Sequence, residues 1–197
     1  PNVFATANIA CDHNQITMEL MRKVALRHGF ACLLHEKPFA GVNGSGKHNN
    51  WSIVTNTGKN VLNPTDKPEE NLVFLTFLCA VLKAVDQYSD LLRLSASCPG
   101  NEDCLGGNEA PPAIISVFLG NALTDMLSDW AHGQTLCRGT KEELLSDVKS
   151  LPQLRRDDSD RNRTSPFAFT GNKFEFRMVG SSQSIGLANT ITNAIVA

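Results

Sequence analysis

The sequence lacks a surplus of charge of either sign. Its 197 residues include 18 basic and 20 acidic side chains, which gives a net charge of −2. Proteins that bind nucleic acid by neutralising phosphates need a basic surplus, so the composition excludes that class. The longest apolar run, residues 72–82, is also far shorter than the ~20 residues that a membrane span requires. We therefore expect neither nucleic acid nor a membrane as a partner.

Paired cysteine spacings are absent as well. The six cysteines occur at positions 11, 32, 79, 98, 104 and 137, and no two of them form a C-x-x-C pair. Scattered cysteines of this kind indicate reduced thiols rather than a disulfide framework. The sequence does not open with a signal peptide. We therefore expect a cytoplasmic protein.

The hydrophobic pattern predicts helices and strands without regular alternation, which indicates an α+β fold. Helices are predicted at residues 13–28, capped by Asp12 and ended by Gly29, and at 69–92, 113–132 and 141–150. Buried or hairpin strands are predicted at 30–34, 51–55, 167–169 and 173–179. Residues 95–112 are rich in glycine and proline, and we expect them to form a mobile lid or binding loop.

Two short segments carry the residue types of an active site. Residues 37–48 place a glycine-rich turn directly before His48. Residues 172–177 alternate, so three charged side chains share one face of a strand: Lys173, Glu175 and Arg177. An imidazole, a carboxylate, two cations and exposed backbone N–H groups suit a site where a divalent metal and phosphates meet a small anion. The residues alone predict a phosphoryl-transfer or ligase site.

Four segments, in this order, resemble the glutamine synthetase family. Residues 43–48, followed by Ser52, resemble its glutamate- and nucleotide-binding loop, Asn-Gly-Ser-Gly-x-His. Residues 107–111 resemble its flap, Gly-x-Glu-Ala-Pro. Residues 162–165 resemble its Asn-Arg-Ser segment, and residues 174–177 its closing x-Glu-x-Arg strand. The flanking sequences, at residues 12–15, 48–52 and 164–167, resemble those of the type III branch, whose subunits are long.

The resemblance implies an antiparallel-sheet catalytic domain with flanking helices, of which residues 1–197 would be one partial domain. Within it, residues 41–52 would form the glycine-rich loop, 95–112 the flap, and 161–179 the arginine segment and closing strand. The metal ligands would be His48 and Glu175, holding Mg²⁺ or Mn²⁺. Glu109 would take a proton from bound ammonium, and Arg163 would stabilise charge on the transferred phosphoryl group.

The remaining implied roles are in binding. Glutamate would contact Asn43, Gly44 and Arg177. The nucleotide would contact Asn50, Ser52 and Lys173. Each candidate also has a simpler interpretation: His48 as a turn residue, Glu175 as a solvent-facing strand residue, and Glu109 as an exposed loop carboxylate.

The activity implied is ATP-dependent ligation of ammonia to the side-chain carboxylate of L-glutamate through a γ-glutamyl phosphate, giving glutamine, ADP and phosphate. ATP would be the co-substrate. The assembly implied is a homo-oligomer of two stacked rings, a dodecamer in type III members. Two alternatives stay open: a γ-glutamyl-amine ligase of the same fold, and a binding or regulatory homologue with impaired turnover.

The sequence departs from the family pattern at two positions that bear on activity. Cys104 stands where the family carries an arginine that holds the substrate carboxylate, and residues 166–169 contain no second arginine. The family's other metal-binding glutamates lie in segments before residue 1. Because His48 and Glu175 supply two of about six ligands, we expect the isolated chain to be inactive.

Overall fold

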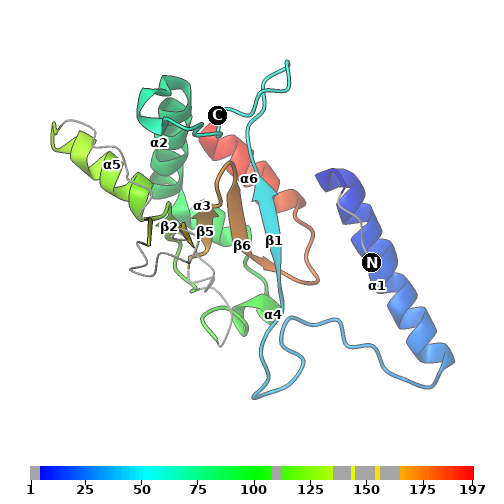
Figure 1. Ribbon diagram of the computed structural model, residues 1–197. Helices are drawn as coiled ribbons and strands as arrows, with labels where there is room; N and C mark the ends of the chain where they lie inside the picture. The colour runs from blue at the N-terminus through cyan, green and yellow to red at the C-terminus, as the bar shows by residue number, and fades with distance from the viewer. Residues whose placement is uncertain (1–4, 108–111, 135–142, 145–153, 156–164) are drawn as a thin grey trace.

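The computed structural model describes residues 5–107, 112–134, 143–144, 154–155 and 165–197. Within these residues, helices flank a mixed four-stranded sheet, which confirms the α+β class (Figure 1). The strands are β1 (Gly46–Trp51), β6 (Phe174–Gly180), β5 (Phe167–Phe169) and β2 (Val117–Phe118), in the spatial order β1-β6-β5-β2. Pairing is antiparallel except between β2 and β5, which are parallel. A separate two-stranded pair joins β3 (Glu143–Leu144) to β4 (Leu154–Arg155).

Helices α2 (Leu72–Gln87), α3 (Ser89–Leu94) and α6 (Gly186–Val196) pack against one face of this sheet. A short 3₁₀ helix, η1 (Pro68–Glu70), leads into α2. Asn71 caps α2, because its side-chain oxygen accepts the N–H of Phe74 at 3.1 Å. Helix α5 (Asn121–Ala131) packs against the same core through Met126, and the short helix α4 (Pro99–Glu102) contacts β6 through Asn101.

The core lies between this helical layer and the sheet, and its centre is aromatic. Phe167 and Phe174 stack with ring centroids 4.9 Å apart, and Phe74 from α2 reaches Phe169 at 5.9 Å. Phe176 joins the same group through Phe167 at 6.0 Å. These rings are almost completely buried, so they contribute a large part of the area that stabilises the fold.

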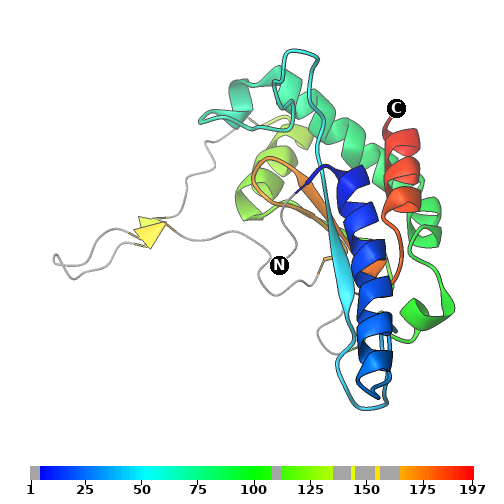
Figure 2. The same ribbon diagram turned by 90° about the vertical axis from the view of Figure 1, so that its right-hand side faces the viewer.

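The first helix, α1 (Ala7–Arg27), stands beside the sheet and contributes no buried residue to the core (Figure 2). Its apolar stripe, predicted from the sequence, is exposed: Ile16 is 57% and Leu20 55% accessible. The helix starts after Thr6, so Asp12 lies inside it and the predicted cap at Asp12 is wrong. Gly29 adopts φ +72° just after the end of the helix, as predicted. None of the described helices combines the length and the apolar character needed to cross a bilayer.

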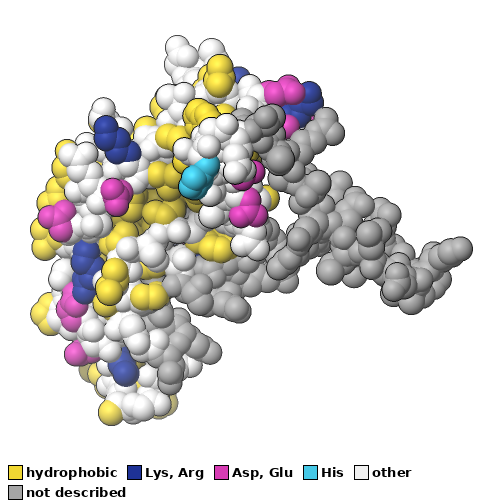
Figure 3. All heavy atoms as spheres, turned by 90° about the vertical axis from the view of Figure 1, so that its left-hand side faces the viewer, with side chains coloured by type: hydrophobic (Ala, Val, Ile, Leu, Met, Phe, Trp, Pro, Cys, Tyr) yellow, Lys and Arg dark blue, Asp and Glu magenta, His cyan; other side chains and the backbone are white. Residues whose placement is uncertain are grey.

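The helical layer also leaves apolar side chains uncovered. Figure 3 shows hydrophobic side chains gathered between charged ones on the side of the molecule where α5 lies. Large apolar residues exposed on α2, α3, α5 and the segment before β2 are Leu72, Val73, Leu91, Leu94, Ile114 and Trp130. The helical layer therefore buries its inner side and leaves these outer side chains exposed.

Two predicted strands are misplaced. Residues 30–34 form no strand, and Phe30 is 72% exposed, because no described segment offers this stretch a hydrogen-bonding neighbour. The strand predicted at 51–55 lies earlier, at Gly46–Trp51, and beyond it Val54 makes only an isolated bridge to Asn60. Pairing with β6, whose residues lie more than 120 positions later in the chain, fixes β1 in the glycine-rich stretch itself.

Three predicted helices also differ. The helix predicted at 69–92 is interrupted at Tyr88, whose φ of −125° falls outside helical values. The helix predicted at 113–132 is confirmed only from Asn121, because Gly120 adopts φ +84° and separates it from β2. Of the helix predicted at 141–150, the structure describes only Glu143–Leu144, which form β3. The strand predicted at 167–169 is confirmed, and the one predicted at 173–179 is confirmed one residue later, at Phe174–Gly180. Gly171, with φ +87°, lies in the turn between them.

Candidate active site

His48 and Glu175 meet on one face of the β1–β6 ladder. Asn50 lies opposite Glu175 in the antiparallel register, and the register shifts between Lys47 and Asn49. This bulge places His48 so that its Nδ1 lies 2.7 Å from Oε1 of Glu175. The predicted approach of the two residues, 127 positions apart, is confirmed. Their role as metal ligands stays a prediction.

Arg177 completes this group from the same face of β6. Its Nε and Nη2 donate to Oε2 of Glu175 at 3.0 and 2.8 Å. The Arg177 side chain is 5% exposed, whereas Glu175 is 16% and His48 31% exposed. Burial alone would raise the pKa of Glu175. Hydrogen bonds from Arg177 and the charges of His48 and Arg177 outweigh burial, so the pKa of Glu175 lies below its usual value.

The chemistry of this group fits one side of a divalent-metal site. An imidazole nitrogen and a carboxylate oxygen lie within hydrogen-bond distance, and both remain partly accessible. A low pKa keeps Glu175 ionised at neutral pH, as a metal ligand must be. Within the described parts of the chain, no group of three or more His, Cys, Asp or Glu side chains could complete a metal site. His48 and Glu175 therefore fit as two ligands of a larger set.

The predicted nucleotide-binding residues flank this pair. Trp51 points toward α6, where its indole N–H donates to Asn193 at 2.8 Å. Because side chains alternate along an extended chain, Asn50 and Ser52 lie on the opposite side from Trp51, and both are exposed. Lys173 lies one residue before β6, where its carbonyl accepts the N–H of Thr170 in the turn. The half-buried Lys173 is thus at the end of the strand that carries Glu175.

The predicted glutamate-binding residues of the loop lie just before β1. Asn43 is exposed, and the neighbouring Ser45 donates its N–H to the carbonyl of Glu36 at 2.7 Å. A Cβ atom added to Gly44 would lie 2.0 Å from Sγ of Cys104, so only glycine fits there. The loop therefore rests directly on the segment that contains Cys104.

Cys104 is buried and cannot replace a cation. Its side chain is 5% exposed. Burial and the nearby charge of Glu36 raise the pKa of the thiol above its usual value, so the thiol is neutral at physiological pH. Cys104 therefore cannot supply the positive charge of the arginine that the family resemblance places at this position.

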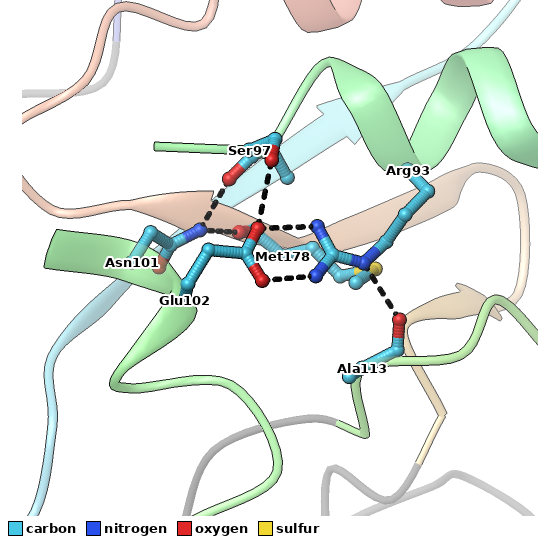
Figure 4. Close-up of polar contacts among 7 residues, drawn as sticks. Arg93, Ser97, Asn101, Glu102, Ala113 and Met178 are labelled. Carbon is cyan, nitrogen blue, oxygen red and sulfur yellow. Dashed lines mark hydrogen bonds and ion pairs between the residues drawn. The ribbon is translucent and has the colours of Figure 1, made fainter. Parts of the chain in front are cut away.

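The first half of the predicted flap, residues 95–112, contains the helix α4 and is held by a network of polar contacts (Figure 4). Nδ2 of Asn101, which is 1% exposed, donates to the carbonyls of Ala96 and Met178, both at 2.7 Å. Arg93 binds both oxygens of Glu102 and also donates from Nε to the carbonyl of Ala113 at 2.8 Å. Arg93 therefore joins the two ends of the predicted flap.

Two predicted catalytic residues, Glu109 and Arg163, lie outside the described residues. Two groups were missed by the sequence interpretation: Glu36, with its buried carboxylate, and the anchor formed by Arg93 and Asn101. A glutamate shortly before a glycine-rich loop carries no recognisable pattern by itself. Its burial depends on contacts with Ser182, 146 positions later.

Comparison with known proteins gives one consistent family. The family described as "Glutamine synthetase, catalytic domain" matches residues 3–98. The type-3 glutamine synthetase of Dictyostelium discoideum is 51% identical over 195 residues, covering 99% of this chain and 26% of that protein. The glutamine synthetase of Butyrivibrio fibrisolvens is 58% identical over 173 residues, covering 88% of this chain and 25% of that protein.

A third relative, the glutamine synthetase of Bacteroides fragilis, is 50% identical over 198 residues, covering 99% of this chain and 27% of that protein. The chain thus spans about a quarter of the length of the curated relatives that it matches. Identity of this level over nearly the whole chain agrees with the four ordered motifs and with an α+β fold that joins the histidine and the glutamate predicted from them. The chain belongs to the glutamine synthetase family, its residues 3–98 match the family's catalytic domain, and a type-3 enzyme is among its relatives.

Proposed function

We propose that the whole protein ligates ammonia to the side-chain carboxylate of L-glutamate with ATP, through a γ-glutamyl phosphate. The observation that carries this proposal is the group formed by His48, Glu175 and Arg177 on one face of the sheet. The names of the three long relatives support it, since each is called a glutamine synthetase.

In this proposal, His48 and Glu175 hold a Mg²⁺ or Mn²⁺ ion together with ligands from the rest of the polypeptide. When bound, such an ion neutralises negative charge on the phosphoryl group that is transferred. Arg177 orients the Glu175 carboxylate through two N–H donors and places a fixed positive charge near the glutamate substrate. A divalent ion needs about six ligands, so the chain alone is expected to bind metal poorly.

The other predicted residues act around this centre. Asn43 and Gly44 bind glutamate through the loop before β1. Asn50, Ser52 and Lys173 contact the nucleotide from the neighbouring strand ends. Glu109 accepts a proton from ammonium, and Arg163 stabilises the transferred phosphoryl group. The proposal includes a cytoplasmic homo-oligomer of two stacked rings.

One observation favours a second candidate, a homologue with impaired turnover. Cys104 is a buried, neutral thiol against Gly44, where the family pattern places a cation for the substrate carboxylate. A glutamate site without that cation would bind its substrate weakly unless another residue supplies the charge.

Steady-state assays of the full-length protein test these candidates. Phosphate release should require ATP, glutamate and ammonia together, and one glutamine should form for each phosphate. Replacing ammonia by methylamine or ethylamine should abolish most turnover; faster turnover with an amine would favour a γ-glutamyl-amine ligase. Absence of phosphate release with every amine, in protein that still binds ATP, would favour the impaired homologue.

A further inference from the structure

Glu36 carries a buried carboxylate that the proposed reaction does not use. It lies in the segment between α1 and the glycine-rich loop and is 2% exposed. Among the described residues, Glu36 and Arg177 are the two charged residues that are buried. Burying a charge is costly unless it is hydrogen-bonded, so the contacts of Glu36 require an explanation.

The carboxylate is held by the turn that follows β6. Oε1 of Glu36 accepts the N–H of Ser182 at 3.0 Å and also the Ser182 hydroxyl. The backbone carbonyl of Glu36 accepts the N–H of Ser45, in the glycine-rich loop, at 2.7 Å. One residue therefore joins the loop before β1 to the turn after β6.

The space around the carboxylate is tight on two sides, where glycines lie against it. A Cβ added to Gly180 would lie 2.6 Å from Oε1, and a Cβ added to Gly100 would lie 2.8 Å from Oε2. Gly180 ends β6 and Gly100 lies in α4, so two segments enclose the side chain of Glu36. Close packing of this kind couples the position of Glu36 to both segments.

The charges that face Glu36 favour its ionised form. Burial raises the pKa of Glu36, but the Ser182 donors, a backbone N–H and the charge of His35 lower it further than burial raises it. Lys47 and Cys104, on β1 and after α4, are the other titratable groups that face it. The half-buried Lys47 is attracted by Glu36 and donates to the carbonyl of Gln183, in the same turn as Ser182. The site is therefore built around a carboxylate anion.

We propose that Glu36 is a positioning residue, which fixes the glycine-rich loop with Asn43 and Gly44 at a set place relative to Glu175 and Arg177 on β6. It acts through Ser45 on the loop and through Ser182 on the end of β6. The inference rests on the proposed function, because Asn43, Gly44 and Arg177 are placed there as glutamate contacts. Glu36 itself contacts no substrate in this proposal.

The first test uses Glu36→Gln in the full-length protein, with the exposed residue change Glu19→Gln as the control. Glutamine keeps the shape of the side chain but loses its charge and the strength of its bond to Ser182. We expect the KM for glutamate to rise about tenfold or more, because the loop that carries Asn43 and Gly44 loses its charge-assisted link to the end of β6. Mn²⁺ affinity should stay within about twofold, since His48 and Glu175 are held by the strand ladder.

A merely structural role would predict a different pattern. If the apparent kcat falls with the fraction of folded protein while metal affinity and the KM values for ATP and glutamate stay unchanged, the positioning role is wrong. An unchanged KM for glutamate in folded Glu36→Gln would also overturn it. Should that variant fail to fold, Ser182→Ala removes one donor only and should give a smaller rise in the same KM. An unchanged KM in Ser182→Ala would then count against the proposal.

Hydrogen exchange separates this inference from the proposed function. In Glu36→Gln, amides of residues 41–47 should exchange faster than in the wild type, while amides of β5 keep their protection. That result would support positioning by Glu36 even if the wild type made no glutamine, in which case only the proposed function fails. Unchanged exchange at residues 41–47 would overturn the inference whatever the activity.

Discussion

The two faces of β6 use neighbouring residues for opposite purposes. On one face, Phe174 and Phe176 are at most 1% exposed and pack against rings from β5. On the other face, Glu175 and Arg177 bind each other and, through His48, join β1. A strand repeat of two residues is sufficient to produce this division.

The difference shows that folding and chemistry depend on different parts of the polypeptide. The apolar face is covered by helices of this chain, including α2 and α6, so its packing is complete within the described residues. The charged face carries hydrogen bonds among His48, Glu175 and Arg177, and within the residues that the structure describes it provides two candidate metal ligands. Changes on the first face should therefore alter stability, and changes on the second should alter ligand binding.

The largest effect is expected from Phe176→Ala. Removing a buried ring leaves a cavity in the aromatic cluster, and such changes typically cost about 3–5 kcal/mol of unfolding free energy. Urea unfolding of the full-length protein measures this loss. Phe39→Ala is the matched control, because Phe39 is 60% exposed and should lose about 0.5 kcal/mol or less. Equal losses in the two variants would contradict the assignment of the core to this face.

A large effect on metal binding, with little effect on folding, is expected from His48→Ala and Glu175→Gln. Each change removes one proposed ligand, so Mn²⁺ affinity should fall more than about tenfold. Titrating Mn²⁺ while following the melting temperature measures this fall. The control is Glu70→Gln, because Glu70 forms an exposed ion pair with Lys67. If both site variants bind Mn²⁺ as the wild type does, the metal-ligand assignment is wrong.

The face of β6 that carries the site was predictable from sequence, because the alternation in residues 173–177 is local. The phenylalanines at 174 and 176 must share one side of a strand, and Glu175 and Arg177 the other. The contact between His48 and Glu175 came from the family resemblance. Nothing in the spacing of the two residues predicts it.

The position of β1 could not be predicted locally. Gly46 to Asn50 are polar or glycine, which are poor strand formers, and they become a strand because β6 provides backbone partners. The apolar residues 30–34 show the converse, since strand-forming side chains without a neighbouring strand leave Phe30 exposed. Glu36 was missed for the same reason, because its partners on β6 and in α4 come together only in the folded chain.

A moderate loss of stability is expected from Asn101→Ala, which tests whether Asn101 connects the predicted flap to β6. Its side-chain amide donates to the carbonyl of Met178, as Figure 4 shows, and to that of Ala96, so alanine would leave both acceptors without this donor. Unpaired buried groups cost about 1–3 kcal/mol. Urea unfolding should detect this loss, and Asn56→Ala, at an exposed turn, is the control. A loss no greater than in the control would show that Asn101 does not anchor the flap to β6.

The smallest effect is expected in the pH dependence of the unfolding free energy, and it comes from Glu36, which binds the turn after β6. The pKa of Glu36 lies below the usual value of 4.5 in the folded state, because Ser182 and the other donors outweigh burial. A lowered folded pKa contributes stability that is present above pH 4.5 and is lost as the pH falls through the folded pKa. Glu36→Gln should therefore show a shallower loss of unfolding free energy below pH 4.5 than the wild type. Unfolding in urea at a series of pH values, in EDTA to remove metal, measures the slope. The control Glu19→Gln should keep the wild-type slope of unfolding free energy against pH. An equally steep slope in Glu36→Gln would mean that the turn does not hold the Glu36 carboxylate as an anion.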